Sequence, residues 1–215
     1  MIRAVTFDLW GTLIQNSEEY DRRLREKRVD LLYAALEEEI SRTDLMNALQ
    51  ESWQEIQCIR STLKDVPTSQ QVSILQQFLN VNSTDLEKPY TEAVLHFLPS
   101  LNPYTMEILR NLNTRIGLIS NTGRTPGKVL RFVLETLGIL AFFDTTIFSN
   151  EVGWLKPHPE IFCKASQDLG VPLNEILHVG DDKVTDEEGA RAAGMHTLLI
   201  ETPSDLRRVR ELVSW

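Results

Sequence analysis

The most constraining feature of the sequence is a short apolar run near its start that ends in a carboxylate and a tight turn. Residues 5–13 read Val-Thr-Phe-Asp-Leu-Trp-Gly-Thr-Leu, so Asp8 directly follows a run typical of a buried β-strand. In parallel sheets, ligands bind at the carboxyl ends of the strands. Because an ionised carboxylate is costly to bury without a cation or hydrogen-bond donors, we expect Asp8 to be a paired structural charge, a nucleophile or a metal ligand.

Apolar runs of the same kind alternate with helical patterns along the rest of the chain. Segments rich in Val, Ile, Leu and Phe predict strands at 2–7, 115–119, 145–148, 176–179 and 196–200. Start and stop signals, above all a closing glycine, predict helices over 125–138, 158–170 and 184–194. Strands that alternate with helices predict an α/β fold built on a doubly wound, Rossmann-like parallel sheet.

The stretch between the first and second predicted strands has a different composition. Positions 16 to 97 contain no glycine, and apolar residues recur at helical spacing. A segment of this length is an insert rather than a loop. We therefore expect a core domain made of residues 1–15 and 99–215, and an all-helical cap domain made of residues 16–98. The insert is well placed to act as a lid; alternatively, it adds only core or an oligomer interface.

Charge and cysteine content exclude several classes of protein. The 215-residue chain has 22 basic and 31 acidic residues, a net charge of −9 and no long basic stretch, so we expect no nucleic-acid partner. A small anionic substrate is compatible with this charge, because a local cation can dominate one pocket. Cys58 and Cys163 lie far apart in segments predicted to be helical and do not suggest a disulfide framework. Without a transmembrane-length run or a signal-peptide pattern, we expect a cytoplasmic protein and no membrane partner.

Polar residues gather where the predicted strands end. Together with Asp8 they are Ser120, Asn121, Lys156, Asp181, Asp182 and Asp186. In a parallel sheet these ends converge on one edge. Several neighbouring carboxylates cannot all stay ionised without a counter-charge, so the pattern predicts a hard divalent cation, for which Mg²⁺ is the natural candidate.

The order and spacing of these residues resemble the motifs of the haloacid dehalogenase superfamily of hydrolases. The motifs of that family are Asp-x-Asp-Gly-Thr, a Ser or Thr at a strand end, a Lys, and Gly-Asp-x-x-x-x-Asp. The corresponding residues of this chain, in the same order, are Asp8 with Gly11 and Thr12, then Ser120, Lys156, and Gly180-Asp181 with Asp186. The insert lies where the family places a helical cap of the C1 type, so the resemblance covers the whole chain.

The resemblance implies a role for each of these residues. Asp8 resembles the nucleophile that forms an aspartyl-phosphate, while Ser120 would hold phosphoryl oxygens and Lys156 would offset negative charge in the transition state. The residues expected to line the substrate site are Leu9, Trp10, Thr12 and Asn121. The resemblance also implies that Mg²⁺ is held by Asp8, the main-chain carbonyl of Trp10, Asp181, and either Asp182 or Asp186, between which the sequence does not decide. These roles predict a Mg²⁺-dependent hydrolase of a small phosphorylated metabolite.

Trp10 departs from the family pattern. Phosphatases of the family carry a second aspartate at this position, which protonates the leaving group and then activates water; a tryptophan cannot exchange a proton near neutral pH. Loss of general acid–base catalysis costs roughly 3–5 kcal/mol of barrier, so we expect slow turnover. Two alternatives stay open: a 2-haloacid dehalogenase, whose relatives carry an aromatic tyrosine at this position, and a non-catalytic phosphate-binding or regulatory protein.

Overall fold

A five-stranded parallel sheet forms the centre of the fold. The computed structural model describes residues 1–37, 40–81 and 85–213. The strand order is β3-β2-β1-β4-β5, and each neighbouring pair is parallel. This arrangement confirms the α/β class, and each strand overlaps one of the predicted runs. The strands are β1 (Ala4–Phe7), β2 (Arg115–Ser120), β3 (Thr145–Phe148), β4 (Ile176–Gly180) and β5 (His196–Leu199).

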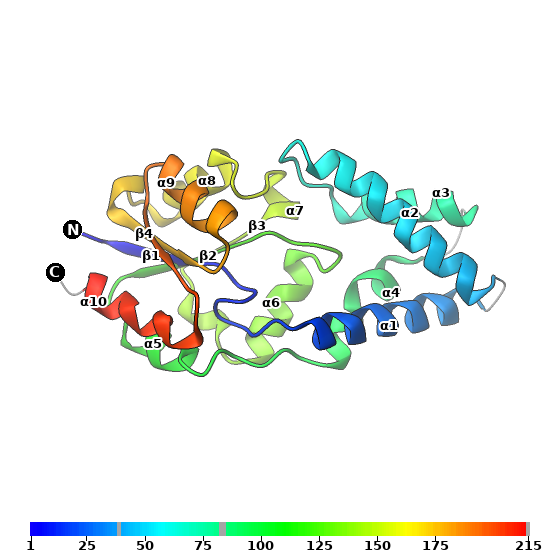
Figure 1. The fold of residues 1–215 in the computed structure, drawn as a ribbon, viewed down its shortest axis with the longest axis horizontal. Helices are drawn as coiled ribbons and strands as arrows, with labels where there is room; N and C mark the ends of the chain where they lie inside the picture. Colours follow the sequence, from blue (N-terminus) through cyan, green and yellow to red (C-terminus); the bar gives the residue numbers. More distant parts are fainter. Residues whose placement is uncertain (38–39, 82–84, 214–215) are drawn as a thin grey trace.

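Helices cover both faces of this sheet (Figure 1). One face packs against α5 (Thr105–Asn111), α6 (Gly127–Thr136) and α10 (Val209–Val213). The other face packs against α8 (Pro159–Leu169) and α9 (Gly189–Ala192), while α7 (Ser149–Val152) follows β3. Because β1 is central and covered on both faces, all of its residues are buried.

The segment after β4 differs from its prediction. Where the sequence predicts one helix over 184–194, the structure has a π-helical turn, Lys183–Glu188, followed by α9. The carbonyl of Asp182 accepts hydrogen bonds from the N–H groups of Asp186 (3.0 Å) and Glu187 (3.2 Å), which widens the turn. Such π-helical insertions are frequent at functional sites, and this one carries Asp186.

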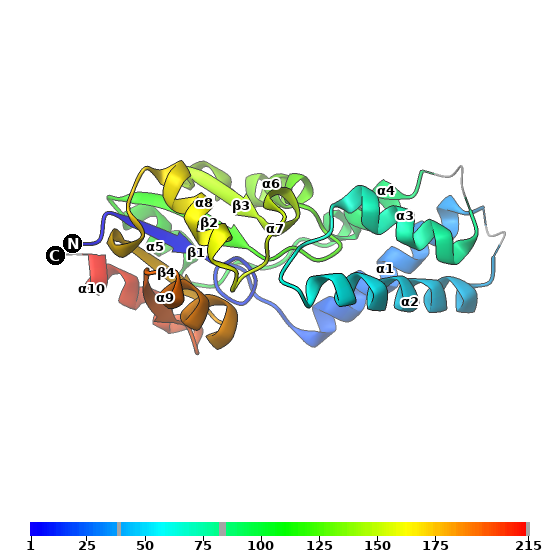
Figure 2. The ribbon, with the colours of Figure 1, turned by 90° about the horizontal axis from the view of Figure 1, so that it is seen from above.

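Four helices form a separate lobe beyond the carboxyl ends of the strands (Figures 1 and 2). They share one apolar cluster, to which Leu32, Leu45 and Leu75 contribute. Ser17 and Ser41 cap the first two helices by accepting backbone N–H hydrogen bonds. The helices are α1 (Glu18–Ala35), α2 (Arg42–Arg60), α3 (Thr68–Leu79) and α4 (Glu87–Thr91).

The loop between α2 and α3 joins this helical lobe to the core. The N–H of Asp65 donates to the carbonyl of Gly153 at 3.1 Å. The buried carboxylate of Asp65 accepts hydrogen bonds from Thr122 Oγ1 (3.1 Å) and Ser149 Oγ (2.5 Å) and pairs with Arg60. The lobe is therefore anchored beside the segment that carries Lys156.

The remaining ordered segments are short. The 3-10 helices are Glu92–His96, Leu140–Phe142, Leu173–Glu175 and Pro203–Arg208. Cys58 and Cys163 are both free thiols. In the part of the chain that the structure describes, no helix has the length and apolar character needed to cross a membrane.

Candidate active site

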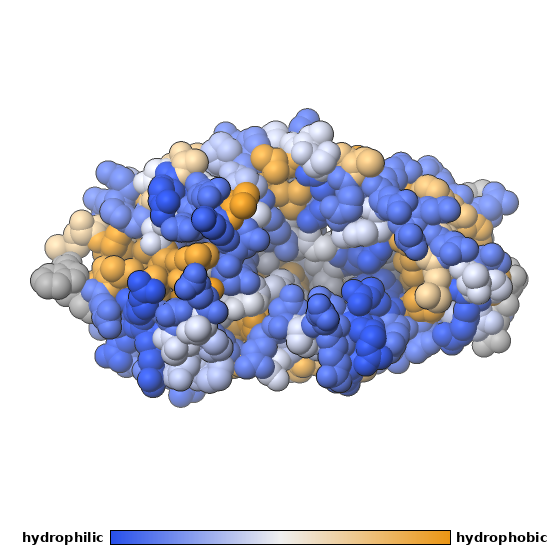
Figure 3. All heavy atoms as spheres, in the orientation of Figure 1, coloured by the Kyte–Doolittle hydropathy of each residue, from blue (hydrophilic) through white to orange (hydrophobic). Residues whose placement is uncertain are grey.

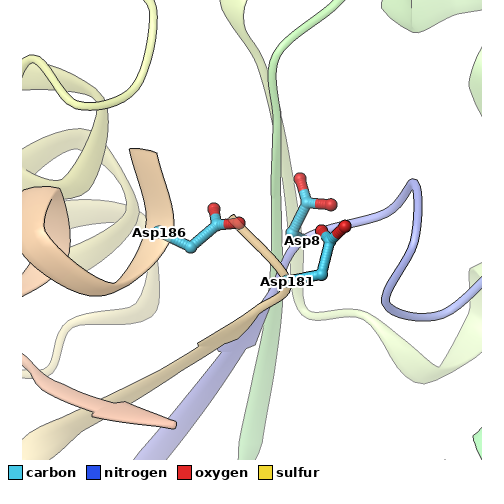
Figure 4. A group of neighbouring side chains, drawn as sticks. All are labelled: Asp8, Asp181 and Asp186. Atoms are coloured by element: carbon cyan, nitrogen blue, oxygen red, sulfur yellow. The ribbon is translucent and has the colours of Figure 1, made fainter. Parts of the chain in front are cut away.

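The pairing register of the sheet brings Asp8 and Asp181 to one edge. In the β1–β4 pair, Phe7 lies opposite Val179, so the residues that follow the two strands leave the sheet close together. Asp8, Asp181 and Asp186 each offer a carboxylate oxygen within 4.8 Å of the others. Figure 4 shows the three carboxylates converging from the end of β1, the end of β4 and the helical segment that follows β4.

Two glycines permit this close approach. A Cβ atom at Gly11 would lie 2.1 Å from Asp181 Oδ2, and a Cβ atom at Gly180 would lie 2.2 Å from Asp186 Cγ. Gly11 also has a φ of +80°, a conformation that strains residues with a side chain. The glycines of the two sequence motifs thus have a steric function: larger residues would push the carboxylates away.

Lys156 contacts two of the three carboxylates directly. Its Nζ atom lies 2.6 Å from Asp8 Oδ1 and 2.5 Å from Asp186 Oδ1. The exposed fractions of Lys156, Asp8 and Asp186 are only 3%, 7% and 2%. One ammonium group therefore faces two buried carboxylates, with Asp181 nearby, and the cluster is negative when all its members are ionised.

Burial changes the acidity of the carboxylates unequally. It raises the pKa of Asp8 from 3.8 to about 7, against the opposing attraction of Lys156, and it also raises the pKa of Asp181. Burial acts in the same direction on Asp186, but the Lys156 ammonium and a hydrogen bond with His178 hold the pKa of that carboxyl well below its usual range. Asp8 and Asp181 are thus the carboxylates that a further cation would stabilise.

His178 is a contact residue of the site that the sequence did not identify. Its Nε2 atom lies 3.2 Å from Asp186 Oδ1, and its Nδ1 atom lies 2.9 Å from Thr6 Oγ1. The buried ring therefore fixes the orientation of the Asp186 carboxylate. The alternation of side chains along a strand could have identified His178. It lies two residues before Gly180, so both residues are on the face of β4 that Asp186 approaches.

Asn121 holds the backbone that carries Lys156. Its Oδ1 atom accepts from the N–H of Lys156 at 2.8 Å, and its Nδ2 atom donates to the carbonyl of Lys156 at 3.0 Å. The sequence predicted that Asn121 lines the substrate site. Although Asn121 does border the cleft described below, both ends of its amide are bonded to Lys156, which makes it a positioning residue.

The other predicted substrate-site residues surround Asp8 in different ways. Ser120 is fully buried at the end of β2, and Thr12 Oγ1 lies 3.4 Å from Asp181 Oδ1. The Leu9 side chain packs in the hydrophobic core, so only its backbone is available to a ligand. Within the described residues, the N–H groups of Leu9 and Trp10 have no protein acceptor.

Asp182 lies outside the carboxylate cluster. Its exposed side chain accepts hydrogen bonds from the N–H groups of Val184 (2.9 Å) and Thr185 (2.7 Å), which makes it the N-cap of the π-helical turn. Of the two carboxylates that the sequence did not separate, the structure therefore brings Asp186 to the site.

A cleft of about 430 Å³ lies between the core and the helical lobe. On the core side it is lined by Trp10 and Asn121, and on the lobe side by residues of α1 and α2. The ring of Trp10 also packs against Tyr20 of α1, with their centres 6.0 Å apart. Figure 3 shows hydrophilic residues around the hollow between the two parts of the molecule.

The donor set at the sheet edge suits a hard divalent cation. All three side chains offer carboxylate oxygens, which Mg²⁺, Ca²⁺ and Mn²⁺ prefer. Burial that raises the pKa of Asp8 and Asp181 also means that these carboxylates lack full compensation from the protein. The residues present therefore fit a metal ion.

Fold and site together define an α/β protein with a cluster of carboxylates at the carboxyl ends of its parallel strands. Residues 2–194 match the family model for haloacid dehalogenase-like hydrolases. The chain belongs to this family of enzymes.

Three known proteins illustrate the range of the family. A glyceraldehyde 3-phosphate phosphatase from Methanopyrus kandleri is 30% identical over 210 residues, which cover 93% of this chain and 84% of that protein. The crystal structure of a HAD phosphatase from Thermococcus onnurineus matches with a TM-score of 0.68 and 22% identity. The match covers 98% of this chain and 97% of the phosphatase chain. A 2-haloacid dehalogenase from Pseudomonas syringae pv. Tomato DC3000 also has a TM-score of 0.68, with 20% identity over 100% and 99% of the two chains. The likeness to the two solved structures therefore concerns the fold and does not select a reaction.

Proposed function

We propose that this hydrolase is a Mg²⁺-dependent phosphatase that acts on a small phosphorylated metabolite through an aspartyl-phosphate on Asp8. The observation that carries the proposal is the group of three convergent carboxylates, two of which pair with one buried lysine. The similarity to a glyceraldehyde 3-phosphate phosphatase over most of both chains supports it. In this proposal, residues 16–98 are the cap domain that covers the site.

The metal site would consist of Asp8, Asp181, Asp186 and the main-chain carbonyl of Trp10. The ion would neutralise phosphoryl oxygens and so lessen their repulsion of the attacking carboxylate. Lys156 would stabilise negative charge on the transferring group. Ser120 and the N–H groups of Leu9 and Trp10 would bind its oxygens. Those two N–H groups support this assignment because no described protein group accepts from them.

The reaction divides into two displacements at phosphorus. A carboxylate oxygen of Asp8 forms a bond to phosphorus as the bond from phosphorus to the ester oxygen breaks, and the leaving oxygen takes a proton from solvent water. Water then attacks the aspartyl-phosphate, which releases inorganic phosphate and regenerates the carboxylate. Trp10 can neither donate the first proton nor accept the second, so turnover is slow and favours leaving groups that depart without a proton.

Dehalogenation is the alternative that the aromatic residue at position 10 favours. The same carboxylate would displace a halide, which needs no proton. The additional carboxylates of Asp181 and Asp186 argue against it, because attack by one carboxylate on carbon needs no divalent cation.

The test is release of inorganic phosphate from p-nitrophenyl phosphate by purified protein with 5–10 mM Mg²⁺ or with EDTA. We expect activity only with Mg²⁺, and its loss in Asp8→Asn. Asp168→Asn, which changes a partly exposed carboxylate paired with Lys164 far from the cluster, is the matched control and should retain activity. The proposal is wrong if wild-type protein releases no phosphate with Mg²⁺, or if it releases chloride from 2-chloropropionate instead.

A further inference from the structure

Three arginines line the cleft. Arg25 and Arg28 belong to α1, and Arg124 follows β2. Together with Trp53 of α2 they line both the cleft of about 430 Å³ and an adjoining cavity of about 530 Å³. We call these four residues the arginine pocket.

Asp21 of α1 also lines the cleft, but it forms no ion pair with the three arginines. Among the described residues, none of the three arginines forms an ion pair with a carboxylate. Arg28 is 6% exposed, and its Nε atom donates to the carbonyl of Tyr90 at 2.7 Å. The chain carries 31 acidic residues, so this lack of a partner is a local property of the pocket.

Arg124, which lines the pocket, has an unused hydrogen-bond donor. Its guanidinium group stacks on Trp53 with 4.2 Å from Cζ to the ring centre, and one terminal nitrogen donates to the carbonyl of Leu49 at 3.1 Å. Its buried Nε atom has no hydrogen-bond partner. A buried donor without an acceptor costs free energy, and such groups are rare unless they serve a ligand.

Burial makes the pocket unfavourable for its own charges. It lowers the pKa of Arg28 to about 10, and the neighbouring Arg124 adds repulsion in the same direction. Burial also lowers the pKa of Arg124. An anion in the pocket would relieve both effects, because it would supply negative charge and accept hydrogen bonds from the guanidinium groups.

The cleft also touches residues adjacent to the carboxylate cluster. The same cleft is lined by Trp10, two residues after Asp8, and by Asn121, which is bonded to the backbone of Lys156. A molecule in the cleft can therefore lie against the arginine pocket at one end and against the neighbours of Asp8 and Lys156 at the other.

We propose that the arginine pocket binds a second anionic group, a carboxylate or a second phosphate, of the substrate whose phosphoryl group lies at Asp8. This inference rests on the proposed phosphatase function and narrows its substrate class. The substrates are small phosphate esters with a further negative charge, rather than phosphates of neutral sugars or alcohols. Arg28 and Arg124 bind the second group, since the planar guanidinium matches carboxylate and phosphate oxygens, and Trp53 holds Arg124 in place.

The test compares two esters of similar size in the presence of Mg²⁺: 3-phosphoglycerate, which has a carboxylate, and glycerol 3-phosphate, which has a hydroxyl group instead. A charge-assisted contact is worth about 10- to 150-fold, so we expect wild-type kcat/KM to favour 3-phosphoglycerate by a factor in that range. Arg124→Met should reduce this preference at least severalfold by raising KM for 3-phosphoglycerate. The matched control is Arg22→Met, an exposed arginine on α1, which should keep the preference.

Two further measurements separate the possible failures. Because Arg124 has an unsatisfied buried donor, Arg124→Met should unfold at the wild-type temperature or above it; Arg124→Lys, which keeps the charge, should retain part of the preference. Equal kcat/KM for the two esters in the wild-type enzyme would overturn the inference and leave the phosphatase function intact. If the wild-type enzyme hydrolyses none of 3-phosphoglycerate, glycerol 3-phosphate and p-nitrophenyl phosphate, the phosphatase function itself is overturned.

Discussion

Replacing Lys156 with methionine tests the electrostatics of the site most directly. The substitution keeps an unbranched side chain but removes the ammonium group that contacts Asp8 at 2.6 Å and Asp186 at 2.5 Å. Both carboxylates are more than nine-tenths buried, so they lose a compensation that solvent cannot replace. Breaking a buried ion pair from one side costs about 3–5 kcal/mol. For a chain of this size, each kcal/mol lowers Tm by about 2–4 °C, so we expect a decrease of about 6–20 °C.

The assay is thermal unfolding followed by circular dichroism at pH 8, where Asp8, with a pKa of about 7, is mostly ionised. Lys164→Met is the control, because it removes an equally short lysine contact, to Asp168, from a side chain that is 46% exposed. An exposed pair of this kind contributes less than about 1 kcal/mol. In EDTA the two variants should therefore differ clearly in Tm.

Addition of Mg²⁺ extends the same experiment to the metal. A cation that binds only the folded state raises Tm, and the effect should be larger in Lys156→Met than in wild type, because the ion then compensates carboxylates that have lost their lysine. Equal Tm values for the two lysine variants in EDTA would refute the argument from buried charge. A Mg²⁺ response in Lys156→Met no larger than that of wild type would refute the idea that ion and ammonium compensate the same carboxylates.

Three further substitutions test other parts of the proposal. Trp10→Asp, which restores a proton donor and acceptor, should raise kcat on alkyl phosphates more than on aryl phosphates, by up to about 10²–10⁴-fold; an equal gain on both would show that proton transfer does not limit the rate. Asn121→Ala removes two hydrogen bonds to the Lys156 backbone and should lower kcat by about tenfold or more with little change in KM, whereas a change in KM alone would indicate direct substrate binding. Asp65→Asn leaves Arg60 without its buried partner and should cost about 3 kcal/mol in urea unfolding; a loss below 0.5 kcal/mol would mean that this anchor between lobe and core is not needed for stability.

The sequence determined the framework of the fold. Apolar runs with turn signals located all of the strands in the described residues, because strands buried on both faces, such as β1 and β4, are nearly continuously apolar. Helix ends were predicted best where a glycine closes the helix: α8 ends at Leu169, next to Gly170 in the left-handed conformation. The motif residues Asp8 and Asp181 could be placed at one edge for the same reason, since parallel strands share the direction of their ends.

The sequence did not determine the direction of the side chains around that edge. Asp182 and Asp186 are the same residue type and cannot be distinguished in the sequence. In the structure, Asp182 is the N-cap of the π-helical turn, whereas Asp186 contacts Lys156. Asn121 could not be identified as a positioning residue, because its bonds reach a segment 35 positions further along the chain.

The arginine pocket shows the same division between sequence and tertiary structure. Basic residues in a charged helix usually lie on a solvated face, and Arg28 belongs to such a helix. Only the tertiary structure shows that Arg28 is buried without a carboxylate beside it. Its burial results from the packing of α1 against Tyr90 and against the loop after β2 that carries Arg124. Local pattern thus decides which strands and helices form, while burial and the pairing of charges depend on contacts between residues far apart in the chain. Only the tertiary structure supplies those contacts.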